Sequence, residues 1–318
     1  MAGCCMLFFL LRHLRSSLYT PASFCKAIKR DLHSSSFPFL TRRQLHRQLR
    51  RQEDVHDLHD LLSKRVVERI PKYNKCAVVG ASPLLLHKGL GSNIDTHEAV
   101  FRVNNSPTTG YEEDVGSFTT ARVFNVANTP TLHKVLLDMN QTGERLDFIF
   151  LKDSISAHIA LSSMPNVPHF RFAVFSRDFI ETARKKIFRR IGVPKHIRVK
   201  VKGAVHNLLV TTGFEIILVA LRSCENVSLY GFGLSGARNS CMHYYDDHST
   251  CERDKWKIIE NTRHHFDVEP YLLLETAKKS SFTCVNAVAI AGNVTHGEMH
   301  LIKAERAISA HVRKDFFV

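Results

Sequence analysis

A phosphate-binding turn is the first chemistry that the residue order suggests. An apolar run that begins at Cys76 ends at Gly80, and the small residue Ser82 follows closely. A glycine at the end of a strand lets backbone N–H groups approach a phosphate. Asn104 comes directly after the next apolar run, and its amide could bind a phosphate or a ribose. A turn at the end of a strand, or a glycosylation site, would also account for Asn104.

A second anion-binding element is expected further along the chain. Thr211, Thr212 and Gly213 stand at the start of an apolar stretch that is typical of a buried helix and continues to Leu221. The N–H and hydroxyl groups at the positive end of such a helix would stabilise a carboxylate or a nucleotide. An ordinary N-cap would use the same residues, so the pattern leaves both roles open.

Two histidines stand in patterned surroundings among the 19 in the sequence. His243 opens the run His-Tyr-Tyr-Asp246, and four residues separate His264 from Glu269. Histidine has an ordinary pKa of about 6.5 and can therefore accept or hold a proton near neutral pH. Most histidines of a protein are surface or core residues, so only their surroundings can single out these two.

Four segments, in order along the chain, resemble the sialyl motifs of eukaryotic sialyltransferases, glycosyltransferase family 29. Residues 76–82, continuing through 94–97, 101–111 and 114–117, resemble the long motif. The short motif is matched by 211–214 with Cys224 and 230–233, the third by 243–246, and the very short one by His264 with Glu269. The resemblance implies an α/β fold of the GT-A-like variant, with a parallel Rossmann-type sheet between helices. It also implies an inverting, metal-independent transferase.

The resemblance assigns roles to individual residues. His264 is expected to be the general base that takes the proton of the acceptor hydroxyl, and His243 is expected to contact the departing phosphate of CMP. His265 would fit a shift by one residue, but the spacing to Glu269 favours His264. The residues expected to bind the donor are Ser82, Asn104, Thr211, Thr212, Gly213, Gly233 and Tyr244.

The substrates follow from the same resemblance. The implied donor is CMP-sialic acid or the related CMP-Kdo, which carry 2-keto acid sugars. The implied acceptor is a glycan hydroxyl on a glycoprotein or a glycolipid. The region 125–206, between the motifs, is expected to shape the acceptor site. No cofactor and no metal ion are expected.

The eight cysteines include no Cys-x-x-Cys pair and no cluster at zinc-finger spacing. By resemblance, Cys76 is expected to pair with Cys224 and so to join the long and short motifs. Cys241 is likewise expected to pair with Cys251 around the third motif. Buried free thiols are the alternative, and the sequence indicates no partner for Cys284.

One position departs from the family pattern. Ala81 stands where family members usually carry an asparagine whose amide contacts the nucleotide. The loss of a hydrogen bond to a charged group costs about 1.5–3 kcal/mol if nothing replaces it. A catalytically weak or inactive homologue that binds partners or glycans in the lumen is therefore the main alternative function.

Other functions fit the residues less well. Gly231-Phe-Gly-Leu-Ser-Gly236 matches a dinucleotide-binding pattern, but a polar stretch follows it instead of a helix. The chain has no Asp-x-Asp motif of the kind that a manganese-dependent transferase would use. The basic segments carry no aromatic or glycine-rich RNA-binding signature, which argues against a nucleic-acid partner.

The elements expected to position these residues are short strands that alternate with helices. Continuous apolar, β-branched runs are typical of strands covered on both faces, as in a parallel α/β sheet. Such runs occur at 76–80, 99–103, 121–125, 147–151 and 227–230. Apolar residues at helical spacing predict a further helix from Arg47 to Ile70, ended by Pro71.

Length and charge indicate the domain organisation. The 318 residues, of which 44% are hydrophobic, can bury one large core or two small ones. The formal charge of +14 lies mostly in residues 1–75, which hold 15 Lys and Arg against 6 Asp and Glu. Residues 1–30 are expected to be a targeting or short anchor-like segment, 31–71 a basic, partly helical stem, and 72–318 the catalytic domain. The Golgi apparatus is the expected location, either as a single-pass type II membrane protein anchored through the N-terminus or as a lumenal protein.

Overall fold

The computed structural model of the chain describes residues 20–49, 65–142, 146–163, 171–192, 198–201, 204–207, 209–233, 241–247, 251, 268–280 and 284–290. Its α-helices are α2 (Pro21–His33), α3 (Arg42–Leu49), α5 (Gly91–Asp95), α6 (Glu112–Val115), α7 (Leu132–Thr142), α8 (Ser154–Ser163), α9 (Arg177–Ile191), α10 (Thr212–Ser223) and α12 (Val268–Lys279), with short 3-10 helices η1 (Pro83–Leu85) and η2 (Thr129–Thr131). Its strands are β1 (Tyr73–Val79), β2 (Ala99–Val103), β3 (Ala121–Phe124), β4 (Phe148–Leu151), β5 (Phe172–Val174), β6 (Arg198–Val201), β7 (Ala204–Asn207), β8 (Cys224–Phe232) and β9 (Val285–Ile290).

Seven of these strands form one parallel sheet, in the order β5-β4-β3-β2-β1-β8-β9. Strand β1 pairs with β2 on one side and with β8 on the other. The chain builds outward from β1 to β5 first and returns to add β8 and β9 on the opposite side. The crevice at the carboxyl ends of the strands, where the order reverses, is the usual ligand site of such sheets.

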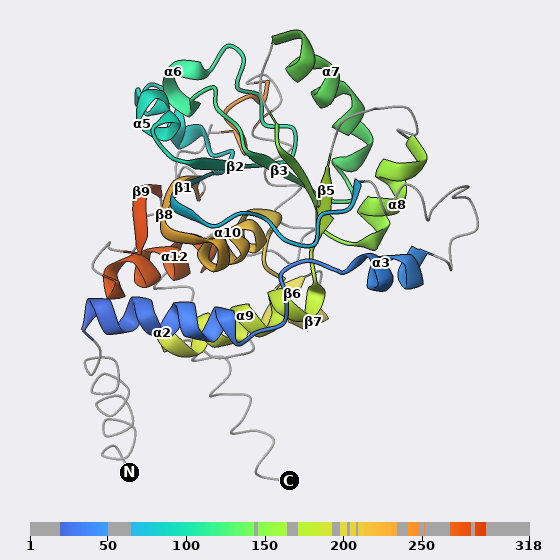
Figure 1. Cartoon of the computed structure of the whole chain (residues 1–318). Helices are drawn as coiled ribbons and strands as arrows, with labels where there is room; N and C mark the ends of the chain where they lie inside the picture. The colour runs from blue at the N-terminus through green and yellow to red at the C-terminus, as the bar shows by residue number, and fades with distance from the viewer. Residues whose placement is uncertain are drawn as a thin grey trace, which may run out of the picture.

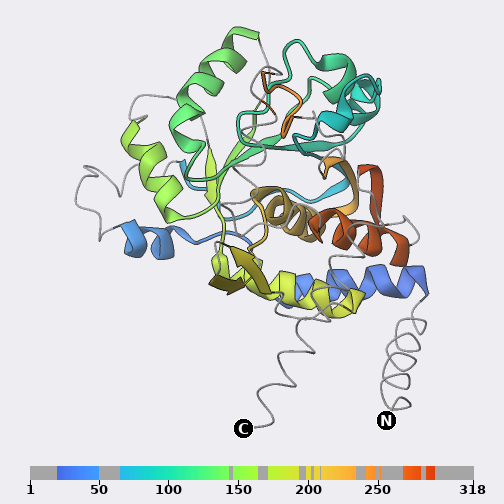
Figure 2. The same cartoon turned by 180° about the vertical axis from the view of Figure 1, so that it is seen from behind.

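Helices cover both faces of the sheet (Figures 1 and 2). Helices α10 and α12 lie against one face, and α2 and α9 form an outer layer beyond them. Alternate residues of β1 enter different cores: Cys76 and Val78 pack on the α10 side, whereas Ala77 and Val79 pack with Leu85 of η1. Burial on both faces explains why the strands are continuous apolar runs rather than alternating ones.

The expected parallel α/β fold is confirmed. The five predicted runs form β1, β2, β3, β4 and β8, and the predicted helix up to Leu221 lies within α10. The runs are mostly apolar because their residues are buried on both faces of the sheet. The strands can therefore be recognised from the sequence without knowledge of the fold.

The predicted helix from Arg47 to Ile70 is wrong in its last part. Helix α3 ends at Leu49, and residues 50–64 lie outside the described residues. Val66 forms a parallel bridge with Phe172, and the Val67 N–H donates to the Phe172 carbonyl at 2.8 Å. Val66 is apolar because it is buried beside β5, an environment that its spacing from other apolar residues does not reveal.

The packing does not follow the expected domain boundary at residue 72. Phe24, Ile28 and Leu32 of α2 are buried in the main core, next to α9 and α10. A disulfide joins Cys25 of α2 to Cys284, directly before β9. The segment around α2 therefore packs as part of the folded domain, and Cys284 has a partner that the sequence did not indicate.

Within the described part of the chain, none of the helices combines the length and the apolar character needed to cross a bilayer.

Candidate functional site

A cavity of about 270 Å³ lies at the carboxyl ends of β1, β2 and β8, where the strand order reverses. Segments far apart in the sequence meet around it: the turn after β1, the ends of β2 and β3, the start of α10, the end of β8, the loop at 242–243 and the start of α12. The predicted site residues that line it are Ser82, Asn104, Thr211, Thr212, Gly213, Gly233 and His243. The structure thus brings together residues that the sequence placed in separate motifs.

Gly80 allows β1 and β8 to approach each other at the base of this cavity. A Cβ atom added at Gly80 would lie 2.3 Å from the carbonyl oxygen of Gly231, so a larger residue would force the strands apart. The Ser82 N–H donates to the same carbonyl at 3.1 Å. Gly233, with φ of 104°, adopts a backbone conformation that other residues rarely take. These contacts fix the turn that follows β1.

A disulfide joins Cys76 of β1 to Cys224 of β8, as the resemblance implied. Both sulphur atoms belong to buried residues on the α10 side of the sheet. The bond therefore connects the two strands whose carboxyl ends frame the cavity. The predicted link between the long and short motifs is confirmed.

Helix α10 begins at the cavity, and Glu269 holds its first turn in place. Thr211 is the N-cap, since its side-chain oxygen accepts the N–H of Phe214 at 3.2 Å. The carboxylate of Glu269 accepts the Thr211 N–H at 2.7 Å and the Thr211 hydroxyl at 2.5 Å. Thr212 and Gly213 follow as the first helical residues and line the cavity. The positive end of α10 is thus directed at any ligand there.

Two carboxyl groups are buried behind the start of α10. Burial raises the pKa of Glu269 to about 7, although the hydrogen bonds from Thr211 act in the opposite sense. Burial also raises the pKa of Glu215 to about 7, against the attraction of the Lys152 ammonium group. Lys152 Nζ lies 3.3 Å from the Glu215 carboxylate. Protonation of both carboxyls therefore changes within the physiological pH range.

The free energy of unfolding is expected to decrease as the pH rises from about 5 to about 8. A carboxyl group with a raised pKa in the folded state stabilises fully below its unfolded pKa, and this stabilisation is lost as the pH rises through the folded pKa. The substitution Glu215→Gln should reduce the decrease by about 1–3 kcal/mol. Urea unfolding at both pH values measures it, with Glu113→Gln on the exposed surface as control. An unchanged pH dependence in Glu215→Gln would contradict the assignment.

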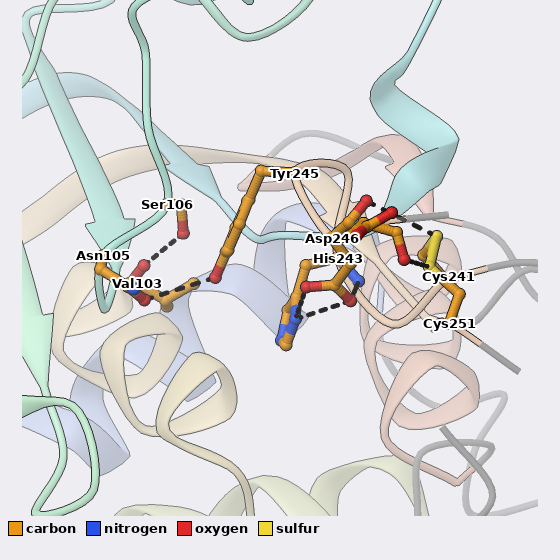
Figure 3. Close-up of polar contacts among 9 residues, drawn as sticks. Val103, Asn105, Ser106, Cys241, His243, Tyr245, Asp246 and Cys251 are labelled. Carbon is orange, nitrogen blue, oxygen red and sulfur yellow. Dashed lines mark hydrogen bonds and ion pairs between the residues drawn. A yellow bond between two sulfur atoms is a disulfide. The ribbon is translucent and has the colours of Figure 1, made fainter. Parts of the chain in front are cut away.

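His243 lines the cavity, and Asp246 holds its ring (Figure 3). Nδ1 of His243 lies 3.0 Å from the Asp246 carboxylate, which also accepts the His243 backbone N–H at 2.8 Å. Burial alone would raise the pKa of Asp246, but the hydrogen bonds from His243 outweigh it and keep this pKa below its ordinary value. The Asp246 carboxylate thus fixes the orientation of the imidazole through Nδ1 and leaves Nε2 as the ring nitrogen for a ligand.

The loop that carries His243 is braced on both sides. The ring of Tyr245 stacks on the imidazole, with ring centroids 5.2 Å apart and an interplanar angle of 13°. A disulfide joins Cys241 to Cys251, as predicted, and closes the loop around His243. The imidazole is therefore presented by a restrained loop.

One predicted site residue of the described part of the chain, Tyr244, is not brought to the cavity. Tyr244 does not line it: the ring packs edge-on against Tyr111, and the hydroxyl donates to the carbonyl of Pro107. Burial raises the pKa of the Tyr244 hydroxyl above its ordinary range. Tyr244 therefore anchors the His243 loop in the protein interior instead of facing a ligand. His264, the predicted base, lies outside the described residues.

The sequence motifs missed two polar residues that line the cavity, Asn125 and Asn128. Asn125 directly follows β3, and its side chain reaches Thr212 of α10. The available signal was its position at the carboxyl end of a predicted parallel strand, where polar residues commonly face a ligand.

Comparisons with known proteins show which family the chain resembles. The family model described as glycosyltransferase family 29 (sialyltransferase) matches residues 29–281. The mouse CMP-N-acetylneuraminate-beta-galactosamide-alpha-2,3-sialyltransferase 2 is 26% identical over 206 residues, 65% of this chain and 55% of that protein. The human CMP-N-acetylneuraminate-beta-1,4-galactoside alpha-2,3-sialyltransferase is 30% identical over 188 residues, 54% of this chain and 48% of that protein.

The chain spans about half the length of the curated relatives that it matches. Among solved structures, a mammalian sialyltransferase in complex with Gal-beta-1-3GalNAc-ortho-nitrophenol is 21% identical, with a TM-score of 0.49. That match covers 81% of this chain and 92% of the other.

Proposed function

Because this chain belongs to glycosyltransferase family 29, the sialyltransferases, we propose that it transfers a 2-keto acid sugar from its CMP ester to a hydroxyl group of a glycan. The observation that carries the proposal is the meeting of long-motif, short-motif and third-motif residues around one cavity. The proposed donor is CMP-sialic acid, with CMP-Kdo as the related possibility. The names of two relatives specify galactoside acceptors, and we extend this class, on a glycoprotein or a glycolipid, to the present chain.

The chemistry needs a base on one side of the anomeric carbon and a stabilised phosphate on the other. We assign the base to His264, which takes the proton of the acceptor hydroxyl as its oxygen bonds to the anomeric carbon. The bond from this carbon to the phosphate oxygen breaks, and the phosphate keeps the electron pair. Attack opposite the leaving group inverts the configuration.

The departing phosphate is stabilised by groups at the cavity. The imidazole of His243, oriented by Asp246 through Nδ1, contacts the phosphate with Nε2. The positive end of α10 at Thr212 acts on the same charge, because both elements line one cavity. The start of α10 supplies positive potential to the leaving group and His243 supplies a ring nitrogen, which is why we propose metal-independent transfer.

Three disulfides among the described residues support a location in the secretory pathway. Disulfides form and persist in oxidising compartments and are rare in the cytosol. We therefore propose that the chain works in the Golgi lumen, with membrane contact through its N-terminal segment.

One observation favours a second candidate function. Ala81 lines the cavity but offers it no side-chain hydrogen bond, so a homologue that binds CMP-sugars or glycans without turnover is the alternative.

The decisive experiment is CMP release by the purified chain with CMP-sialic acid and with CMP-Kdo, across a panel of galactosides and N-acetylgalactosaminides. Acceptor-dependent release with either donor supports transfer and identifies the donor. Binding of a CMP-sugar without acceptor-dependent release supports the alternative. Absence of both binding and release contradicts both functions.

A further inference from the structure

The side chain of Asn125 is held in one orientation by its own loop. Its Oδ1 accepts the backbone N–H of Asn128 at 3.0 Å and the Asn128 side-chain amide at 2.9 Å. The Asn125 carbonyl accepts the N–H and the hydroxyl of Thr129 at 2.9 and 2.8 Å, which closes the turn after β3. The partners of an asparagine side chain determine which end is oxygen and which is nitrogen. Because Oδ1 already accepts two hydrogen bonds from the loop, Nδ2 must point the other way.

The other side of Asn125 is the cavity wall. Nδ2 lies 3.4 Å from the side-chain oxygen of Thr212, the first residue of α10. Since this oxygen accepts from Asn125, the Thr212 hydroxyl can direct its own proton into the cavity. Asn104, whose Oδ1 accepts the Asn125 backbone N–H at 3.3 Å, likewise has its amide nitrogen turned away from that bond.

Hydrogen-bond donors therefore gather on one part of the cavity wall. They are the amide of Asn125, the amide of Asn104 and the hydroxyl of Thr212, all of residues that line the cavity. The start of α10 adds positive potential at the same place. The Glu269 carboxylate also borders the cavity, but it accepts two hydrogen bonds from Thr211. Such a set of donors suits an anionic oxygen better than a neutral hydroxyl, because hydrogen bonds to charged acceptors are the stronger ones.

We propose that Asn125 binds an anionic group of the donor directly, together with Asn104 and Thr212, and that Asn128 positions its amide. This rests on the proposed function, since that function supplies the two candidate groups: the phosphate of CMP and the carboxylate of the sugar. The assignment also provides a side-chain amide in a cavity where Ala81 has none.

The variant Asn125→Asp tests the proposal with little change of shape. It keeps the oxygen that Asn128 contacts and replaces the NH₂ group by an oxygen that repels anions. Calorimetric titration with CMP, cytidine and CMP-sialic acid is expected to show at least about tenfold weaker binding of an anionic ligand. If the affinity for CMP and for CMP-sialic acid falls while the affinity for cytidine is unchanged, the phosphate is the group that Asn125 contacts. If only the affinity for CMP-sialic acid falls, the carboxylate of the sugar is the group that Asn125 contacts.

Two further variants separate a direct contact from a general effect of charge. Asn226→Asp introduces the same charge at an exposed position near the start of β8. This position lies at the amino ends of the strands, away from the cavity at their carboxyl ends, so all three affinities should be unchanged. Asn125→Ala removes the amide without adding charge and should still weaken binding of the anionic ligand about tenfold. Melting curves of each variant establish that it is folded.

Unchanged affinity for CMP and CMP-sialic acid in both Asn125 variants overturns this proposal and leaves the proposed function standing. Weaker binding of the anionic ligand in Asn125→Asp, with native affinity in Asn125→Ala, also overturns the proposal. Charge repulsion without a direct contact would then explain the result. If the native chain binds neither CMP nor CMP-sialic acid, the proposed function fails and this assignment fails with it.

Discussion

Replacing His264 by alanine is expected to lower acceptor-dependent CMP release by about 10²–10⁴-fold, the usual contribution of a positioned general base. The physical reason is that the attacking hydroxyl has no other group assigned to take its proton. Donor affinity should change little, because the cavity residues that we propose as the donor site, such as Asn104, Thr212 and His243, come from other segments. Steady-state kinetics with calorimetric CMP titration on the same variant measures both quantities.

The matched control for this experiment is His265→Ala, which alters the adjacent residue. If the register of the very short motif is right, His265→Ala retains most of the turnover. A large loss in His265→Ala with near-native turnover in His264→Ala would move the base by one residue. Near-native turnover in both variants would contradict a base in this motif.

Removing the Cys76–Cys224 bond, as Cys76→Ala with Cys224→Ala, is expected to lower the free energy of unfolding by about 5 kcal/mol. The bond spans 148 residues of sequence, and a cross-link that closes a longer loop restricts the unfolded chain more. Since β1 and β8 also frame the cavity, we expect CMP affinity to fall as well. Denaturant unfolding under non-reducing conditions measures the stability loss.

The Cys241–Cys251 bond provides the internal comparison for that prediction. It spans only 10 residues, so its removal by paired alanine substitutions should cost about 3 kcal/mol. Its main effect should be on His243, because the bond closes the loop that carries this residue. A stability loss for Cys241–Cys251 that equals or exceeds that for Cys76–Cys224 would contradict the loop-length argument.

The sheet was predictable from sequence because burial on both faces leaves a local signature. Each of β1, β2, β3, β4 and β8 contains a mostly apolar, buried run, and α10 is apolar around most of its surface because it lies between the sheet and the outer helices. In such elements the local composition alone reflects the final environment. The disulfides Cys76–Cys224 and Cys241–Cys251 were predictable only through the resemblance to a family.

Elements whose environment depends on distant partners were not predictable. Helix α2 is rich in basic residues, yet Phe24, Ile28 and Leu32 are buried against helices that come much later in the chain. Val66 joins the edge of β5, which its neighbours in sequence do not indicate. The Cys25–Cys284 bond spans 259 residues and follows from that same docking of α2.

The candidate site divides in the same way. Ser82, Asn104 and Thr212 were found because they stand in motifs, and the cavity unites them. Tyr244 stands in a motif too, but its hydroxyl is buried against Pro107, since the third motif also has to anchor its own loop. Asn125 belongs to no motif, and its proposed role depends on the orientation imposed by Asn128, which only the folded turn shows.

The most direct test of the central claim is a structure of the chain with bound CMP. The account predicts that the nucleotide occupies the cavity at the carboxyl ends of β1, β2 and β8, with its phosphate within hydrogen-bonding distance of the start of α10 and of His243. It also predicts that the imidazole of His264 faces the same cavity. A nucleotide bound elsewhere on the chain, or a His264 side chain directed away from the cavity, would contradict it.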